Sequence, residues 1–142
     1  MDKKIFIVDD DPFHLMLVQQ VLINNGFEDV FLFESGTACL ENLEKNPDII
    51  ILDHNMDTLT GYEVLRKIKR HNPDIFVIMV SAQEEISTAV NSLKHGAFDY
   101  LQKGADIEPK LLDVINRIDL VKEKLLLKKN TFLKTLFGNS MQ

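Results

Sequence analysis

The stretch Pro47–Asp53, which reads Pro-Asp-Ile-Ile-Ile-Leu-Asp, constrains the fold of this chain more than any other. Its four apolar residues, Ile49 to Leu52, run without interruption and end at the carboxylate of Asp53. A short apolar run rich in β-branched residues predicts a strand buried on both faces, which is typical of a parallel sheet. Ligands bind beyond the carboxyl ends of such strands. Asp53 is therefore either a turn residue, as aspartates often are where strands end, or a reactive carboxylate that requires partners.

Strands and helices alternate along the rest of the chain. We expect strands at residues 4–8, 29–33, 49–53, 75–80 and 98–102. Asp11 and Pro12 are suited to be the cap and the first residue of a helix after the first strand. Further helices are expected at residues 35–46, 61–70 and 84–95, and a last helix begins near Ile107 and runs long. These βα units predict an α/β, flavodoxin-like fold: a doubly wound five-stranded parallel sheet in the order 2-1-3-4-5 with an extended C-terminal helix.

Periodicity also predicts which side chains lie inside the protein. The helix at residues 84–95 has an apolar stripe that is expected to face the core, and three sulfur-containing side chains fall in other apolar segments. These residues are Ile86, Ala89, Val90 and Leu93 in the helix, and Met16, Cys39 and Met79 elsewhere.

Composition restricts the class of function. The chain has 142 residues, for which one domain is the default, and its net charge of −6 argues against nucleic acid as a partner. The single cysteine suits a reducing compartment and predicts a cytoplasmic location. The apolar runs are too short to predict a membrane span. His14, His71 and His95 do not have the spacing of metal ligands.

Polar side chains stand where four of the expected strands end. Asp9 and Asp10 follow the first strand, Asp53 ends the third, Ser81 follows the fourth and Lys103 follows the fifth. In the order 2-1-3-4-5 the first and third strands are neighbours at the switch point, so three carboxylates converge there. Like charges this close require a cation, and carboxylates with water suit Mg²⁺. The cluster has a use if one carboxylate attacks a phosphoryl group while Lys103 neutralises its oxygens.

These features resemble the receiver domain of bacterial two-component response regulators, apparently without an output domain. The resemblance covers residues 3 to about 124, which we expect to form the receiver domain. Each piece is weakly specific alone, but their order at matching strand ends is strongly specific. The pieces are Ile7-Val8-Asp9-Asp10-Asp11, Pro47–Asp53 followed by Met56 and Gly61, Val80-Ser81-Ala82, and Phe98-Asp99-Tyr100-Leu101-Gln102-Lys103.

The resemblance implies a phosphoacceptor site. Asp53 would receive a phosphoryl group from a phosphohistidine on a sensor histidine kinase or phosphotransfer protein. Mg²⁺ would be bound directly by Asp10, Asp53 and the backbone carbonyl of Asn55, and through water by Asp9. Lys103 would be the ammonium that binds the phosphoryl group. The domain would then catalyse its own phosphorylation and dephosphorylation without being an enzyme in the usual sense.

The resemblance also implies a switch and a timer. Ser81 would be the switch hydroxyl and Tyr100 the switch aromatic, and together they would alter the surface around the fourth helix, fifth strand and fifth helix for an unknown downstream protein. Asn55 and Gln83 would flank the path of the attacking water and so set the lifetime of the phosphoryl group. The alternative for Tyr100 is an ordinary strand residue with its hydroxyl in water.

Two positions depart from the family pattern. Proline usually follows the methionine of the phosphorylation loop, where this chain has Asp57. Proline also usually follows the lysine, joined by a cis bond, where this chain has Gly104. Because a cis bond before a residue other than proline costs about 2.5–4 kcal/mol, either the loop follows a trans path or the site supports unusual strain.

Two other classes share parts of the pattern. A phosphatase of the haloacid-dehalogenase type also has an aspartate nucleophile after its first strand, and Asp9-Asp10-Asp11 supplies its Asp-x-Asp. However, Phe13 stands where that class has Thr or Val, and its later acidic motif is missing from the sequence. An FMN-binding flavodoxin-like domain requires a hydroxyl- and glycine-rich loop after the first strand, where this chain has three acids.

The C-terminal residues 125–142 are expected to be a helical extension. Residues 1–108 have 9 Lys and Arg against 19 Asp and Glu, whereas residues 109–142 have 7 against 3. Asn130 is suited to cap a further short helix with Phe132, Leu133, Leu136 and Phe137 on one face. This apolar face predicts partner docking or a homodimer, and folding back onto the domain or binding a membrane surface are the alternatives. The sequence leaves open whether the chain is free-standing or part of a longer protein.

Overall fold

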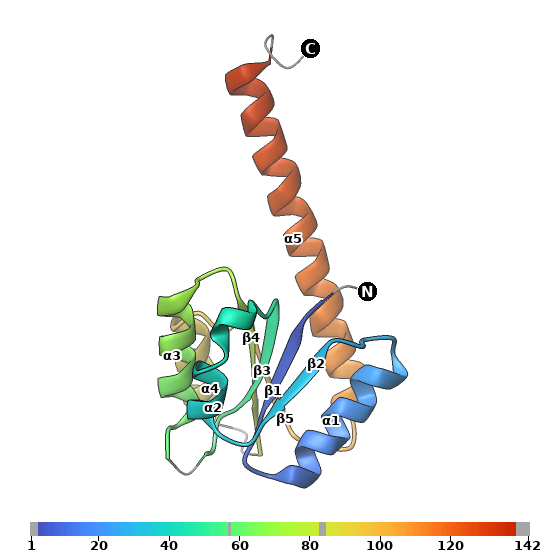
Figure 1. Cartoon of the computed structure of the whole chain (residues 1–142), viewed down its shortest axis with the longest axis vertical. Helices are drawn as coiled ribbons and strands as arrows, with labels where there is room; N and C mark the ends of the chain where they lie inside the picture. Colours follow the sequence, from blue (N-terminus) through green and yellow to red (C-terminus); the bar gives the residue numbers. More distant parts are fainter. Residues whose placement is uncertain (1–2, 57, 83–84, 139–142) are drawn as a thin grey trace. The chain divides into compact units, whose positions relative to one another are not determined.

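The computed structural model describes residues 3–56, 58–82 and 85–138. Strands and helices alternate from the N-terminus, as Figure 1 shows. The elements are β1 (Ile5–Val8), α1 (Pro12–Asn24), β2 (Val30–Phe33), α2 (Gly36–Leu40), the 3₁₀ helix η1 (Leu43–Lys45), β3 (Ile49–Asp53), α3 (Gly61–His71), β4 (Phe76–Ser81), α4 (Ile86–Lys94), β5 (Asp99–Gln102) and α5 (Ile107–Phe137).

The strands form one parallel sheet in the order β2-β1-β3-β4-β5, which confirms the predicted topology. Val8 of β1 pairs with Leu52 of β3, Asp53 pairs with Val80 of β4, and Ser81 pairs with Gln102 of β5. Every residue of β1 and β3 is buried, as expected for central strands of unbroken apolar sequence. This register aligns the carboxyl ends of β1, β3, β4 and β5 at one edge of the sheet.

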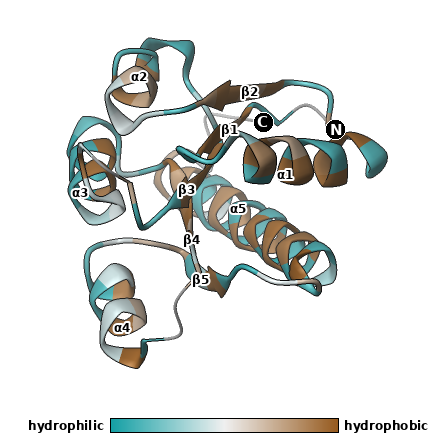
Figure 2. Cartoon of the chain, turned by 90° about the horizontal axis from the view of Figure 1, so that it is seen from below, coloured by the Kyte–Doolittle hydropathy of each residue, from teal (hydrophilic) through white to brown (hydrophobic). Residues whose placement is uncertain are grey.

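Helices cover both faces of the sheet. Helix α1 lies on one face, and α2, α3 and α4 lie on the other (Figures 1 and 2). Between the sheet and the second group of helices is an apolar cluster that includes Cys39, whose predicted burial is confirmed. The main buried members of this cluster are Phe6, Val8, Cys39, Leu43, Ile50, Leu52, Val64, Leu65, Ile68, Val77 and Met79.

Side-chain caps begin the helices near the strand ends. Asp11 Oδ1 accepts a hydrogen bond from the Phe13 N–H at 3.0 Å, which confirms Asp11 as the N-cap of α1. Ser35 Oγ accepts from the Ala38 N–H at 3.1 Å, and Thr60 Oγ1 accepts from the Glu63 N–H at 3.2 Å. These caps fix where the chain turns from each strand end into the next helix.

The helix expected at residues 35–46 is wrong in its length. Helix α2 ends at Leu40, and the separate 3₁₀ turn η1 follows it. Asn42 Nδ2 donates to the Ala38 carbonyl at 2.7 Å, and Asn46 adopts a left-handed conformation with φ of 57°. Polar side chains that bond to the backbone in this way compete with the helix, which is why the apolar spacing alone overestimated its length.

The predicted inward stripe of α4 is also wrong. Ile86 is 81% exposed, Val90 and Leu93 are exposed as well, and Ser92 is the buried residue of this helix. Met16 is likewise exposed on α1, whereas Met79 is fully buried as predicted. An apolar stripe of helical spacing therefore gives α4 its amphipathic character without placing that stripe in the core.

The chain divides into two compact units, residues 1–108 and 109–142. The second unit consists of the continuation of α5, which runs to Phe137 without the separate helix predicted after Asn130. Leu111, Val114, Ile115 and Ile118 are buried. From Leu120 onward seven large apolar side chains are 51–61% exposed, while Val121 and Leu133 are half-buried; the seven are Leu120, Leu125, Leu126, Leu127, Phe132, Leu136 and Phe137.

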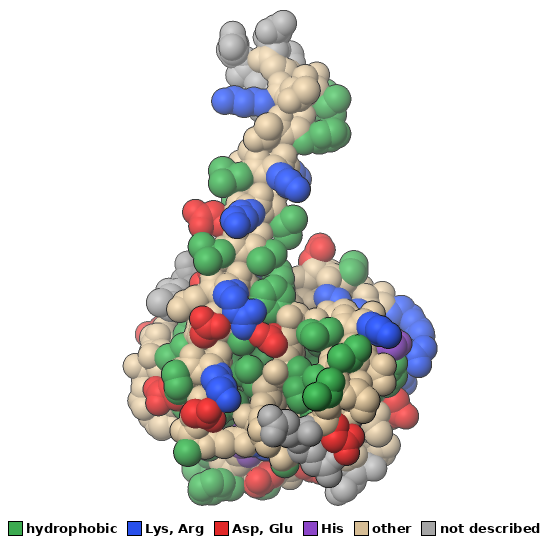
Figure 3. All heavy atoms as spheres, turned by 180° about the vertical axis from the view of Figure 1, so that it is seen from behind, with side chains coloured by type: hydrophobic (Ala, Val, Ile, Leu, Met, Phe, Trp, Pro, Cys, Tyr) green, Lys and Arg blue, Asp and Glu red, His purple; other side chains and the backbone are tan. Residues whose placement is uncertain are grey.

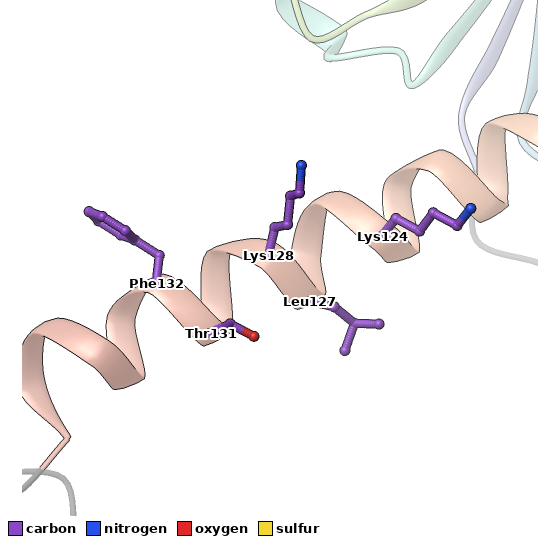
Figure 4. A pocket seen from close by; sticks show the side chains of 5 residues that line it. All are labelled: Lys124, Leu127, Lys128, Thr131 and Phe132. Atoms are coloured by element: carbon purple, nitrogen blue, oxygen red, sulfur yellow. The ribbon is translucent and has the colours of Figure 1, made fainter.

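Hydrophobic and basic side chains are interspersed along this part of the helix (Figure 3). Lys124, Leu127, Lys128, Thr131 and Phe132 line an open hollow on its surface (Figure 4). Among the described residues, no helix is both long enough and apolar enough to span a bilayer. The predicted boundary between residues 124 and 125 stays a prediction.

Candidate functional site

Four strand ends place polar side chains at one edge of the sheet. Asp9 directly follows β1, Asp53 ends β3, Ser81 ends β4 and Lys103 directly follows β5. Backbone hydrogen bonds continue the sheet at this edge: the Asp9 N–H donates to the Phe33 carbonyl at 3.0 Å, and the Lys103 N–H donates to the Ser81 carbonyl at 2.8 Å. The positions of Asp9 and Lys103 are thus fixed by the sheet itself.

Three carboxylates meet at this edge. Asp9, Asp10 and Asp53 each offer an oxygen, and these oxygens lie within 4.8 Å of one another. Asp9 and Asp53 are only 1% and 3% exposed, whereas Asp10 is exposed to solvent. Oxygen ligands of this charge at the solvent boundary suit a hard divalent cation that keeps part of its water shell. The residues present therefore fit the metal that the sequence predicts.

Asp9 is held by hydrogen bonds to both of its oxygens. Oδ1 accepts from the Asp11 N–H at 2.9 Å, and Oδ2 is 2.7 Å from His14 Nδ1 and 2.9 Å from Lys103 Nζ. Burial alone would raise the pKa of Asp9, but the hydrogen bonds from His14, Asp11 and Lys103 lower it to about 2. Asp9 is therefore a fixed negative charge.

The pKa of Asp53 is shifted in the opposite direction to that of Asp9. Its Oδ1 is 3.4 Å from Lys103 Nζ. Burial, followed by the charge of Asp9, raises the pKa of Asp53 to about 6, against the lowering effect of Lys103 and the Asn55 N–H. Burial alone would lower the pKa of Lys103, but its contacts with Asp9 and Asp53 raise it, so the lysine is charged. Asp53 is thus the more basic of the two buried carboxylates at neutral pH.

The sequence prediction missed His14. It stands in the first turn of α1, is 8% exposed and directs Nδ1 towards Asp9. Spacing relative to the other histidines gave no signal, because its partner is a carboxylate at the end of β1. The available signal was the position itself: a polar residue on the apolar face of a helix that begins at the cluster.

Two other predicted site residues, Ser81 and Asn55, lie near the three carboxylates but make longer contacts. Ser81 is fully buried, and its Oγ is 3.5 Å from Asn55 Nδ2. The Asn55 N–H is 3.4 Å from Asp53 Oδ1. Tyr100 is half-buried and packs against the apolar cluster between the sheet and the helices α2, α3 and α4. Gln83 and Asp57 lie outside the described residues.

The two glycines near the site have different roles. The Lys103–Gly104 bond is trans, because no cis peptide bond occurs among the described residues. Gly61 donates its N–H to the His54 carbonyl at 2.9 Å, which closes the loop after β3. A Cβ at Gly61 would overlap the Asp53 carbonyl oxygen and lie 2.6 Å from His54 Cα, so only glycine allows this approach.

Comparison with known proteins decides the family. A family model described as the response regulator receiver domain matches residues 5–116. The chain belongs to this family. It is 39% identical over 105 residues to the transcriptional regulatory protein ZraR of Klebsiella oxytoca, covering 73% of this chain and 24% of that protein. It is 32% identical over 118 residues to the chemotaxis protein CheY of Bacillus subtilis, covering 82% of this chain and 98% of CheY.

Solved structures agree with this assignment. The CheX–CheY–BeF3–Mg²⁺ complex from Borrelia burgdorferi matches with a TM-score of 0.76 at 26% identity, covering 82% of this chain and 88% of that chain. The receiver domain of DrrB in its BeF3-activated form matches with a TM-score of 0.76 at 29% identity, covering 83% of this chain and 97% of that chain. This receiver thus belongs to a family of phosphoacceptor signalling modules.

The haloacid-dehalogenase alternative is not supported. It requires a nucleophile after the first strand, which is Asp9. Both Asp9 oxygens are already engaged at 2.7–2.9 Å by Asp11, His14 and Lys103, whereas the contacts of Asp53 with Lys103 and Asn55 are 3.4 Å long.

Proposed function

We propose that Asp53 of this receiver accepts a phosphoryl group from the phosphohistidine of a sensor histidine kinase or phosphotransfer protein. The observation that carries the proposal is the environment of Asp53: a carboxylate with a pKa raised to about 6, placed 3.4 Å from the Lys103 ammonium. A carboxylate of this basicity is largely ionised at pH 7 and is a better nucleophile than an ordinary aspartate.

In the transfer step, an Asp53 carboxylate oxygen forms a bond to phosphorus. The phosphorus–nitrogen bond of the phosphohistidine breaks, and its electron pair returns to the imidazole ring. Lys103 lies between Asp9 and Asp53 and is placed to bind the oxygens of the transferring group. Asp9 keeps Lys103 at the site before transfer, since the two form an ion pair of 2.9 Å.

Asp10, Asp53 and the Asn55 carbonyl would hold Mg²⁺ directly, with Asp9 acting through water. When bound, Mg²⁺ supplies positive charge that offsets the phosphoryl oxygens and the repulsion among the carboxylates. The three carboxylates and the exposed position of Asp10 support this assignment. In the separate hydrolysis step, Asn55 and Gln83 would hold the water that attacks phosphorus; the bond between phosphorus and the Asp53 oxygen breaks, inorganic phosphate leaves, and the Asp53 carboxylate is regenerated.

The output is proposed to run through Ser81 and Tyr100. Ser81 Oγ is buried at the end of β4, beside the site, where its hydroxyl would move to donate a hydrogen bond to an oxygen of the phosphoryl group. Tyr100 lies on β5, beside α4, whose exposed Ile86, Val90 and Leu93 provide an apolar surface for a downstream protein. The single buried cysteine supports a reducing, cytoplasmic location for this exchange.

Phosphorylation by a small acyl phosphate in the presence of Mg²⁺ tests the site. The intact mass should rise by one phosphoryl group in the wild type, and Asp53→Asn should abolish the increase. Asp74→Asn, an exposed aspartate in the turn before β4, is the matched control and should be labelled like the wild type. Labelling of Asp53→Asn to the same stoichiometry would show that the nucleophile is another residue.

We further propose that α5 from Leu120 onward forms a homodimer contact. Seven large apolar side chains of this segment are more than half exposed, which is unfavourable for a helix in water. Deleting residues 126–142 should leave Asp53 phosphorylation intact and reduce the association state measured by light scattering. If the truncated protein keeps its association state and melts at a lower temperature, the segment belongs to the fold of the monomer.

A further inference from the structure

His14 is a buried histidine beside the acidic cluster, and the proposed function gives it no role. Its Nδ1 lies 2.7 Å from Asp9 Oδ2, while its Nε2 is buried and has no hydrogen-bond partner among the described residues. We propose that His14 is a positioning residue, which holds the Asp9 carboxylate in place while Lys103 moves from Asp9 to the phosphoryl group on Asp53. This inference rests on the proposed function of Asp53.

The direction of the hydrogen bond follows from its partner. An ionised carboxylate can only accept, so His14 Nδ1 must carry the hydrogen and donate it. In the neutral ring Nε2 is then an acceptor, and it needs no donor of its own to keep Nδ1–H on Asp9. Among the described residues, the hydrogen bond to Asp9 is therefore the one that the His14 ring makes.

His14 and Lys103 bind the same oxygen. Asp9 Oδ2 lies 2.7 Å from His14 Nδ1 and 2.9 Å from Lys103 Nζ, and the other oxygen accepts from the Asp11 N–H at 2.9 Å. Lys103 Nζ is also 3.4 Å from Asp53 Oδ1. A phosphoryl group on Asp53 brings new oxygens to Lys103, which must loosen its contact with Asp9 to bind them.

Releasing Lys103 would be costly if Asp9 depended on it. Asp9 is 1% exposed, so bulk water does not reach the oxygen that Lys103 leaves, and a buried charged oxygen with fewer donors is strongly unfavourable even where a water shared with Mg²⁺ contacts the carboxylate. Because His14 remains on Oδ2 and Asp11 remains on Oδ1, each oxygen keeps a donor after Lys103 leaves. His14 thus lowers the cost of transferring Lys103 to the phosphorylated side chain.

Two substitutions separate the hydrogen bond from the packing of the ring. His14→Leu removes the donor and keeps an apolar side chain of similar volume, whereas His14→Asn keeps an amide donor near the position of Nδ1. With a small acyl phosphate and saturating Mg²⁺, His14→Leu should be phosphorylated about tenfold more slowly, the effect of losing one hydrogen bond to a charged group. His14→Asn should restore most of the rate, and His71→Leu, exposed at the end of α3, should retain the full rate.

The decisive measurement is a double-mutant cycle with Lys103. If His14 acts by allowing Lys103 to move, the effect of His14→Leu should disappear in a Lys103→Ala background. A tenfold effect that persists without Lys103 would identify a merely structural role and overturn the proposal. A wild-type rate in His14→Leu, with wild-type protein labelled at Asp53, would also overturn it.

Two further results keep the inference separate from the proposed function. If the wild type is not labelled at Asp53, the proposed function itself fails. If His14→Leu does not fold, the imidazole ¹⁵N spectrum of the metal-free wild type decides: Nδ1 of His14 should carry a proton. The opposite tautomer would place no donor on Asp9 and would overturn the inference.

Discussion

Replacing Asp53 by asparagine should stabilise the metal-free protein. Burial and the charge of Asp9 raise the pKa of Asp53 from 3.8 to about 6, so the folded state disfavours its ionised form. At 1.36 kcal/mol per pH unit, this difference corresponds to about 3 kcal/mol of lost stability at pH 7.5. The side chain is 3% exposed, so solvent screening does not reduce this figure substantially. Asp53→Asn removes the charge and should raise the free energy of unfolding by about that amount.

The pH dependence identifies the cause. Because the pKa of Asp53 is higher in the folded state, that state binds the proton more tightly between pH 3.8 and about 6, and the stability contributed by this group falls as pH rises through that window. The advantage of Asp53→Asn should therefore shrink to about 1 kcal/mol at pH 4.5. Urea unfolding in EDTA measures both values, with Asp74→Asn as the control. A variant no more stable than wild type at pH 7.5, or equally favoured at both pH values, would refute the reasoning.

Three other predictions concern the metal, the timer and the loop. Asp10→Ala should weaken Mg²⁺ binding by at least about tenfold, since loss of even an indirect partner has that effect, and calorimetry should show this without a lower melting temperature for the metal-free variant. Asn55→Ala and Gln83→Ala should change the half-life of the phosphorylated protein, and two unchanged half-lives would remove both residues from the reaction. Gly61→Ala should destabilise the fold and slow labelling of Asp53, because its Cβ would meet backbone atoms that cannot move aside; a variant with the wild-type melting temperature and labelling rate would contradict that close packing.

The sheet and its functional edge were predictable because both follow from short-range signals. Apolar runs that end in carboxylates mark strand ends, and parallel strands align those ends, so Asp9, Asp53 and Lys103 meet without any knowledge of side-chain packing. Helix phase is harder to predict. The same apolar spacing is found in α3, which packs on the sheet, and in α4, which leaves Ile86 exposed.

Two other misses have physical causes of the same kind. The contact of His14 with Asp9 depends on the rotation of the first turn of α1 relative to the end of β1, which no spacing in the sequence encodes. The predicted cap at Asn130 is wrong because α5 continues through this residue. Within a helix the backbone N–H groups are already bonded to preceding carbonyls, so no free N–H remains for the Asn130 side chain to accept from. A capping residue in the sequence therefore predicts the start of a helix only where the preceding helix has already ended.

The loop after β3 is held by backbone hydrogen bonds at both of its ends. His54 is fixed by its N–H, which donates to the Val80 carbonyl at 2.9 Å, and its own carbonyl receives the Gly61 N–H at 2.9 Å. Both ends of the loop thus lie beside Asp53 and are positioned by backbone groups, so where the chain enters and leaves the loop does not depend on the side chains of the loop. Substitutions such as Asn55→Ala therefore change the chemistry beside Asp53 without moving the end of β3, so the proposed lifetime of the phosphoryl group is set separately from the sheet that positions the carboxylate.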